Sequence, residues 1–277
     1  MGKTPPGRLT DRQDSAFSGW IKAAYRENRM LLHGIFSVAL GLLLWEIIDR
    51  WFNDKYFFTG PDEVIREFIH LVREGEIWIH LRYSALEGLY GFTLAATAGV
   101  LFGTMLAFSR TLDEMSSPIL IGLYATPRPV VAPLFIVWLG LGVASKVAVI
   151  FIASFFPVAI NTTAGIKNVE SEFRMLGRAF QVSPWAMFTK IIIPGSLPFL
   201  IAGLRLGYSR AIVTIMVAEM FGSEAGLGYM IVHATQVFDI PKMMVGISML
   251  TLWGILGNEA LKLVERRATP YKQTLGI

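Results

Sequence analysis

The stretch "FRMLGRAFQVSPWAMFTKIIIPGSLP", residues 173–198, decides how this chain is organised, because it is charged and amphipathic but lies between two long apolar runs. Each run reaches about 20 residues, the length that a helix needs to cross roughly 30 Å of hydrocarbon. Hydrophobic residues make up 53% of the 277 residues, and charged residues only 17%. We therefore predict an all-α integral membrane protein whose polar central segment emerges from the bilayer on one side.

Apolar segments along the sequence predict a polytopic protein with about six transmembrane helices. The predicted spans are residues 30–50, 82–108, 117–141, 144–165, 197–221 and 243–264. A short amphipathic helix is expected to start at Pro61, because proline and the acidic residues that follow it favour a first helical turn. The transmembrane domain is predicted over residues 30–265, between an N-terminal tail of residues 1–29 and a C-terminal tail of residues 266–277.

The distribution of Lys and Arg predicts the orientation, because these residues are enriched in the cytoplasmic loops of membrane proteins. The N-terminal tail, the segment between the fourth and fifth spans and the C-terminus are basic, whereas the loop after the first span is mostly acidic. Six spans then place both termini and residues 168–190 in the cytoplasm. The segment "GSEAGLGYMIVHATQVFDIPK", residues 222–242, lies outside. It is expected to be either a short helix that gates the pathway or meets a binding protein, or a plain connection.

Composition excludes several kinds of site. The chain has no cysteine, so disulfides, thiolate metal sites and cysteine nucleophiles are excluded. Its four histidines do not cluster at ligand spacing, and we predict no metal site. We assign the net charge of +4 to basic residues that flank the spans rather than to a nucleic-acid surface. The sequence contains no G-x-x-x-x-G-K-[ST] loop, so the chain itself is not expected to bind or hydrolyse ATP.

The cytoplasmic segment 168–190 predicts two short helices with a break near Val182 and a turn at Pro194-Gly195. Ser183 suits the N-cap of the second helix and Pro184 its first position. Such a segment either docks in a groove of another protein or lies on lipid head groups. The candidate docking residues are Glu170, Phe173, Arg174, Leu176, Gly177, Phe180, Gln181, Ser183, Pro184 and Trp185.

The same segment resembles the cytoplasmic loop of ABC-importer permeases, whose pattern is Glu-Ala-Ala, three residues, Gly, nine residues, Ile, one residue, Leu-Pro. Aligning the final proline with Pro194 places Ile191 and Ile193 on the Ile and Leu of the pattern. Residues 175–177, Met-Leu-Gly, then stand where Glu-Ala-Ala is expected, and Gln181 stands where the glycine is expected. The first half of the pattern is therefore degenerate in this chain.

Two longer stretches resemble permeases of the nitrate/sulfonate/taurine type. They are "LYATPRPVVAPLFIVWLGLGVASKVAVIFIASFFPVAINTTAGIKNV", residues 123–169, and "LPFLIAGLRLGYSRAIVTIMVAEMFGSEAGLGYMI", residues 197–231. The resemblance implies a type I ABC-importer transmembrane domain in a bacterial cytoplasmic (inner) membrane, working as a homodimer. It also implies a cytoplasmic ABC ATPase dimer that docks on residues 168–190 and binds ATP and Mg, and an extracytoplasmic substrate-binding protein. The chain itself would then be neither an enzyme nor the holder of a cofactor.

Polar residues inside the predicted spans are candidates for the translocation pathway. A charge at the bilayer centre costs at least about 2.5–3.5 kcal/mol, so Arg128 and Arg210 are expected either to line a route for a small anion or to satisfy freed carbonyls or a glutamate, Glu219 or Glu87. The other candidates for the route are Tyr124, Thr126 and Asn161. Asn161 equally suits a contact between helices.

Glycines of the second span, Gly91, Gly99 and Gly103, predict close helix packing. The most specific function that the sequence predicts is import of a small solute, such as nitrate, a sulfonate, a taurine-like anion or a small heterocycle. The alternative is a secondary transporter of a small anion driven by an ion gradient.

Overall fold

The computed structural model describes residues 33–52 and 58–269. The chain divides into two compact units, Met1–Glu63 and Val64–Ile277. In the first unit residues 33–52 are helical, and the Trp45 indole donates a hydrogen bond to the carbonyl oxygen of Thr59 at 2.8 Å. The predicted tail 1–29, the start of the first span and most of the C-terminal tail lie outside the described residues.

The regular elements of the described residues after this first helix are all helical, and they confirm the predicted all-α fold. In chain order they are α2 (Pro61–Glu74), α3 (Glu76–Phe108), α4 (Arg110–Ala125), α5 (Arg128–Leu139), α6 (Val143–Ala179), α7 (Pro184–Met187), the π-helical turn η1 (Phe188–Ile192), α8 (Ile193–Met220), α9 (Leu227–Gln236) and α10 (Ile240–Ala268). Within the described part of the chain, four helices are long and apolar enough to cross a membrane, or five if α4 and α5 form one broken span.

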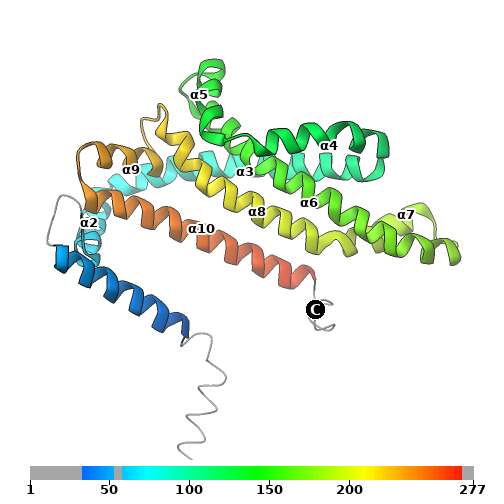
Figure 1. Cartoon of the computed structure of the whole chain (residues 1–277), viewed down its shortest axis with the longest axis horizontal. Helices are drawn as coiled ribbons and strands as arrows, with labels where there is room; N and C mark the ends of the chain where they lie inside the picture. Colours follow the sequence, from blue (N-terminus) through cyan, green and yellow to red (C-terminus); the bar gives the residue numbers. More distant parts are fainter. Residues whose placement is uncertain (1–32, 53–57, 270–277) are drawn as a thin grey trace, which may run out of the picture. The chain divides into compact units, whose positions relative to one another are not determined.

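The second unit is built around α6, which packs against α3 on one side and α8 on the other (Figure 1). The predicted glycines of α3 create this contact. A Cβ atom on Gly99 would lie 2.9 Å from Val158, and one on Gly103 would lie 2.5 Å from the Ala159 carbonyl oxygen. Both distances are too short for any side chain, so the prediction of close packing is confirmed.

Helix α10 packs against α8 and α9. The Tyr208 hydroxyl donates a hydrogen bond to the Trp253 carbonyl oxygen at 3.0 Å, and Gly257 leaves the room that the Tyr208 ring occupies. Arg205 pairs with Glu265 at 3.2 Å nearer the C-terminal end of α10. Within the predicted last span, the Asn258 amide donates to the Ser209 hydroxyl at 3.3 Å, so polar contacts join α10 to α8 along its length.

The predicted third span, residues 117–141, is not one straight helix. Helix α4 ends at Ala125, α5 begins at Arg128, and the two axes differ by 103°. Thr126 and Pro127 have extended backbone angles, with ψ of 129° and 117°. The cause is proline: the residue before a proline is pushed out of the helical region, and Pro127 and Pro129 follow each other at two-residue spacing.

Candidate functional site

The segment between α6 and α8 forms an exposed bend, which we call the elbow and define as residues 177–192. Helix α6 continues well past its predicted end at residue 165 and stops at Ala179. Gln181 then adopts a left-handed conformation with φ of 50°, and the Val182 amide donates a hydrogen bond to the Gly177 carbonyl oxygen at 2.9 Å. This is a Schellman C-cap, in which the left-handed position is usually glycine. The glycine expected from the family pattern is thus replaced by Gln181 without loss of the turn.

The second half of the elbow begins at the predicted N-cap. The Ser183 hydroxyl accepts a hydrogen bond from the Ala186 amide at 3.3 Å, and Pro184 occupies the first helical position. The predicted break near Val182 and the cap at Ser183 are confirmed, but the prediction of two short helices is wrong, because the break separates two helices of 37 residues each, Val143–Ala179 and Pro184–Met220. The physical reason is that a serine side chain satisfies one of the free amides at a helix start, where proline has no amide to satisfy.

The predicted turn at Pro194-Gly195 is wrong. Both residues lie in the first turn of α8, which follows η1 without a break, so Pro184–Met220 forms one 37-residue helix. The Ile193 amide bonds to the Phe188 carbonyl oxygen, five residues back, and Pro194 comes directly after this wide turn. Proline has no amide to donate, and here it comes directly after a wide π-helical turn, through which the helix continues.

The elbow is anchored at its base and exposed at its tip. Ile192 belongs to a buried cluster with Ala107 and Ile166, and the Phe188 ring lies 5.5 Å from that of Phe108. At the tip, Phe180 is 78% exposed and Trp185 is 74% exposed.

Among the other predicted docking residues, Gln181, Ser183 and Pro184 are also exposed. Gly177 is buried, and a Cβ there would overlap the end of the Met187 side chain. The absence of a side chain at Gly177 therefore lets Met187 of α7 lie against α6. The backbone of Glu170, Phe173, Arg174 and Leu176 is part of α6, and their side chains lie outside the described part of the structure.

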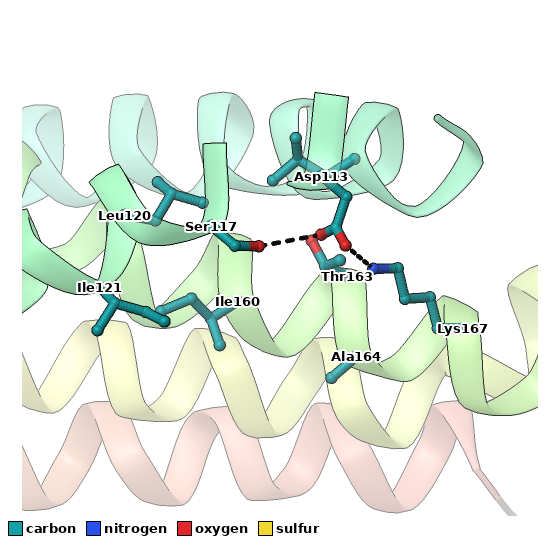
Figure 2. Close-up of a pocket in the computed structure, with 9 residues that line it drawn as sticks. Asp113, Ser117, Leu120, Ile121, Ile160, Thr163, Ala164 and Lys167 are labelled. Carbon is teal, nitrogen blue, oxygen red and sulfur yellow. Dashed lines mark hydrogen bonds and ion pairs between the residues drawn. The ribbon is translucent and has the colours of Figure 1, made fainter. Parts of the chain in front are cut away.

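A pocket of about 290 Å³ lies between α3, α4 and α6 (Figure 2). Asp113 and Lys167 form an ion pair of 2.5 Å at one end, and the Ser117 hydroxyl points to Asp113 at 3.4 Å. The remaining lining is mostly apolar and consists of Leu106, Leu120, Ile121, Ile160, Thr163 and Ala164. An apolar chamber with a charged pair at one end suits a small solute that has both an apolar and a charged part.

Sequence reasoning did not select the polar residues of this pocket. In the sequence, Lys167 is one of the basic residues that predict the orientation of the spans, and Asp113 lies in a short, nearly neutral loop. The signal that could have found them is the presence of opposite charges just beyond the predicted cytoplasmic ends of two neighbouring spans, since opposite charges on neighbouring helices attract.

The predicted pathway residues have separate surroundings. Tyr124 packs against the buried cluster of Leu106, Leu120 and Phe156. The Thr126 hydroxyl donates to the Gly122 carbonyl oxygen at 3.2 Å. The Asn161 amide donates to the Pro157 carbonyl oxygen at 2.8 Å.

Asn161 also faces α8, since a Cβ on Gly203 would lie 2.7 Å from the Asn161 Cβ. Arg210 is exposed on α8, while Arg128 begins α5 and its side chain is not described. Glu219, one of the partners considered for these arginines, accepts hydrogen bonds from Ser84 at 2.5 Å and from the Gly228 amide at 2.6 Å.

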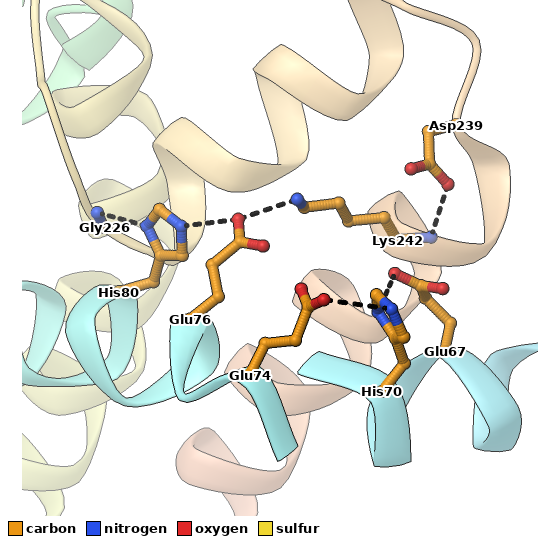
Figure 3. Close-up of polar contacts among 8 residues, drawn as sticks. All are labelled: Glu67, His70, Glu74, Glu76, His80, Gly226, Asp239 and Lys242. Carbon is orange, nitrogen blue, oxygen red and sulfur yellow. Dashed lines mark hydrogen bonds and ion pairs between the residues drawn. The ribbon is translucent and has the colours of Figure 1, made fainter. Parts of the chain in front are cut away.

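At the far end of α8 from the elbow, polar residues join α3, α10 and the turn before α9, while Glu67, His70 and Glu74 pair along α2 (Figure 3). Glu76 pairs with Lys242 at 2.7 Å and lies 3.4 Å from His80, whose other ring nitrogen accepts the Gly226 amide at 3.1 Å. Asp239 caps α10 by accepting the Lys242 amide at 3.1 Å. Partial burial raises the pKa of the Glu67 carboxyl on α2, and the negative charge of Asp239 raises it further.

These features define a class: a helical protein with several apolar spans, in whose described part an anchored elbow with exposed aromatic side chains joins two long helices. The chain belongs to the family of binding-protein-dependent transport system inner membrane components, whose pattern matches residues 99–270. The predicted resemblance to ABC-importer permeases is therefore confirmed. The chain is the membrane permease subunit of a binding-protein-dependent ABC importer.

Individual relatives agree with this assignment. The Bacillus subtilis protein named as an aliphatic sulfonates transport permease, SsuC, is 30% identical over 92% of this chain and 89% of its own length. The formylaminopyrimidine transport permease ThiX of Halalkalibacterium halodurans is 28% identical over 84% of this chain and 92% of its own. A chain of the MetNI methionine ABC transporter, solved in inward-facing conformations, has the same fold, with a TM-score of 0.57 and 18% identity over 72% of this chain and 96% of that chain.

Proposed function

We propose that two copies of this permease form the pathway, that a separate ATPase binding ATP and Mg docks on the elbow, and that an extracytoplasmic binding protein delivers a small organic solute. The observation that carries the docking assignment is the exposure of Phe180 and Trp185 on an anchored elbow. Burying a large apolar side chain contributes about 1.5–3 kcal/mol, so the two aromatics together offer a partner roughly 3–6 kcal/mol.

For the substrate, the first candidate is an aliphatic sulfonate. The relative from Bacillus subtilis is named for such compounds. The pocket beside Asp113 and Lys167 supports this class, because its apolar walls suit an alkyl chain and Lys167 can meet a sulfonate group. A small heterocycle of the kind named for the relative from Halalkalibacterium halodurans is the second candidate.

The experiment is reconstitution of the permease with an ATPase and a binding protein encoded by neighbouring genes, in liposomes. We expect uptake of ethanesulfonate that requires ATP, the ATPase and the binding protein together. Uptake driven by a proton or sodium gradient without ATP would contradict the proposal and favour secondary transport. Uptake of a formylaminopyrimidine and not of a sulfonate would change the substrate alone.

A pair of variants tests the docking surface. The double change Phe180→Ala and Trp185→Ala should weaken ATPase binding at least tenfold, a loss of about 1.4 kcal/mol. The matched control is Trp78→Ala, because Trp78 is 58% exposed at the start of α3, away from the elbow. Equal ATPase binding by the wild type, the double variant and Trp78→Ala would refute docking at this surface.

A further inference from the structure

Glu219, in the last turn of α8, is buried without contact to solvent and is the point where three helices meet. One carboxylate oxygen accepts the Ser84 hydroxyl of α3 at 2.5 Å, and the other accepts the Gly228 amide of α9 at 2.6 Å. The Ser84 oxygen in turn accepts the Leu227 amide at 2.7 Å. We call this set, Ser84, Glu219 and residues 226–228, the latch.

The backbone of the latch fits the carboxylate closely. Gly226 has φ of 130°, and a Cβ there would overlap the Glu219 carboxylate. A Cβ on Gly228 would lie 2.8 Å from the Met216 Cα of α8. Glycines at both positions let the start of α9 come close to the Glu219 carboxyl group, and the Gly228 amide at this helix N-terminus donates to it.

Further buried polar groups surround the latch. Glu87 of α3 is 2% exposed and is a second buried carboxyl group close to Glu219. Lys146 of α6 is 4% exposed and donates to the carbonyl oxygens of Leu141 and Gly222. The His80 ring accepts the Gly226 amide (Figure 3). The turn between α8 and α9 is therefore held by α3 and α6 together.

The latch and the elbow lie at opposite ends of one long helix. Pro184–Met220 has 37 residues, which at 1.5 Å per residue makes about 55 Å. Figure 1 shows α7 at one end of α8 and α9 at the other. A helix of this length that is fixed to α9 by hydrogen bonds carries α9 with it when its other end moves.

From this geometry we propose that Glu219 is the positioning residue that couples the elbow to α9: through the latch, a displacement of the elbow by the docked ATPase moves α9 and opens or closes the far end of the pathway. The proposal rests on the proposed function, in that it takes the elbow as the place where the ATPase acts. It assigns to Glu219 a role in coupling rather than in substrate binding.

The test compares Glu219→Leu with Glu219→Gln in the assembled complex. Leucine keeps the approximate size of the side chain but leaves the Gly228 amide and the Ser84 hydroxyl without their acceptor. Glutamine keeps one oxygen for the Gly228 amide and can direct its own amide to Ser84 or Glu87, so it is the matched control. Ser84→Ala is a third, milder variant, which removes the acceptor of the Leu227 amide.

Two readouts are needed. Hydrogen exchange at the Leu227 and Gly228 amides should accelerate at least tenfold in Glu219→Leu and change less than about threefold in Glu219→Gln. Substrate transported per ATP hydrolysed should fall at least fivefold in Glu219→Leu, while ATP hydrolysis and substrate KM stay close to the wild type. A merely structural residue would lower the amount of complex without changing this ratio.

Wild-type exchange in Glu219→Leu would overturn the latch, and faster exchange with an unchanged transport ratio would overturn the coupling role. If Glu219→Leu does not assemble, Ser84→Ala decides by the same two readouts. If the wild-type complex shows no ATP-driven uptake, the proposed function fails, and exchange at the two amides still decides whether the latch exists.

Discussion

Replacing Gln181 by glycine should stabilise the elbow. Gln181 is exposed and left-handed, with φ of 50°, so the substitution removes strain and loses no buried contact. The left-handed conformation costs an L-residue about 1–2 kcal/mol, which glycine avoids. Glycine has more conformational freedom when the turn is open, and this offsets roughly 0.5–1 kcal/mol of the stabilisation. We therefore expect a net stabilisation of about 0.5–1 kcal/mol, equal to a two- to fivefold shift between closed and open forms.

The assay is hydrogen exchange at the Val182 amide, which donates to Gly177 and reports the closed turn directly. Exchange should slow about two- to fivefold in Gln181→Gly, because that is the shift that the free energy above corresponds to. It should change little in Gln181→Asn, since asparagine tolerates the left-handed region. It should accelerate in Gln181→Val, whose branched side chain does not fit there. If Gln181→Gly left the Val182 amide unchanged or faster, the left-handed cap would not be what holds the elbow.

Three other changes have definite expected outcomes. Gly103→Ala should lower the free energy of unfolding of the purified permease by at least about 2 kcal/mol, because the new Cβ would lie 2.5 Å from the Ala159 carbonyl oxygen. Gly122→Ala is the control, because Gly122 has open space around it. Asp113→Asn should leave Lys167 without its counter-charge. A small sulfonate added on the cytoplasmic side should then inhibit uptake more strongly than it does in the wild type. An unchanged inhibition constant would show that Lys167 does not line the route. Burial raises the pKa of Glu67, so the folded state binds the proton of this carboxyl group more tightly than the unfolded state, and the stability that Glu67 contributes falls as pH rises above the ordinary carboxyl range. In thermal melts between pH 4 and pH 7, Glu67→Gln should make the loss of stability with rising pH smaller. Parallel curves of stability against pH for the two proteins would contradict this prediction.

The parts of the fold that the sequence predicted are those set by local physics. The Ser183 cap with Pro184 and the glycines of α3 act through nearby atoms, and both were found in the structure as expected. The apolar runs predicted helices correctly, but of the six predicted spans the described residues contain four, or five if α4 and α5 form one. The bend at Pro127 was missed in spite of its prolines, because a continuous apolar run suggested one span. The turn predicted at Pro194 is wrong because the helix passes this proline directly after the wide π-helical turn η1, which the sequence pattern does not reveal.

The candidate site was harder to predict because its partners are distant in sequence or belong to the backbone. Lys167 meets Asp113 only once α4 folds against α6. Glu219 looked like a counter-charge for an arginine, yet it accepts the Gly228 amide and the Ser84 hydroxyl. A backbone amide leaves no signature of its own in a sequence. The sequence does contain one signal of this contact, the pair of glycines at residues 226 and 228, where the backbone lies close to Glu219 and Met216 of α8.

The two ends of the helix Pro184–Met220 are closed by different devices, and the difference matches what each end is proposed to do. At the elbow the turn before the helix contains one strained residue, Gln181, and is closed by the bond from the Val182 amide to the Gly177 carbonyl oxygen, so it can open at a cost of a few kcal/mol. At the latch, Glu219 is fully buried and both of its oxygens accept hydrogen bonds, so opening it would leave buried polar groups without partners, at a cost of about 1–3 kcal/mol for each group. A displacement applied at the compliant end is therefore absorbed partly in the elbow, while the stiff end transmits what remains to α9 without breaking.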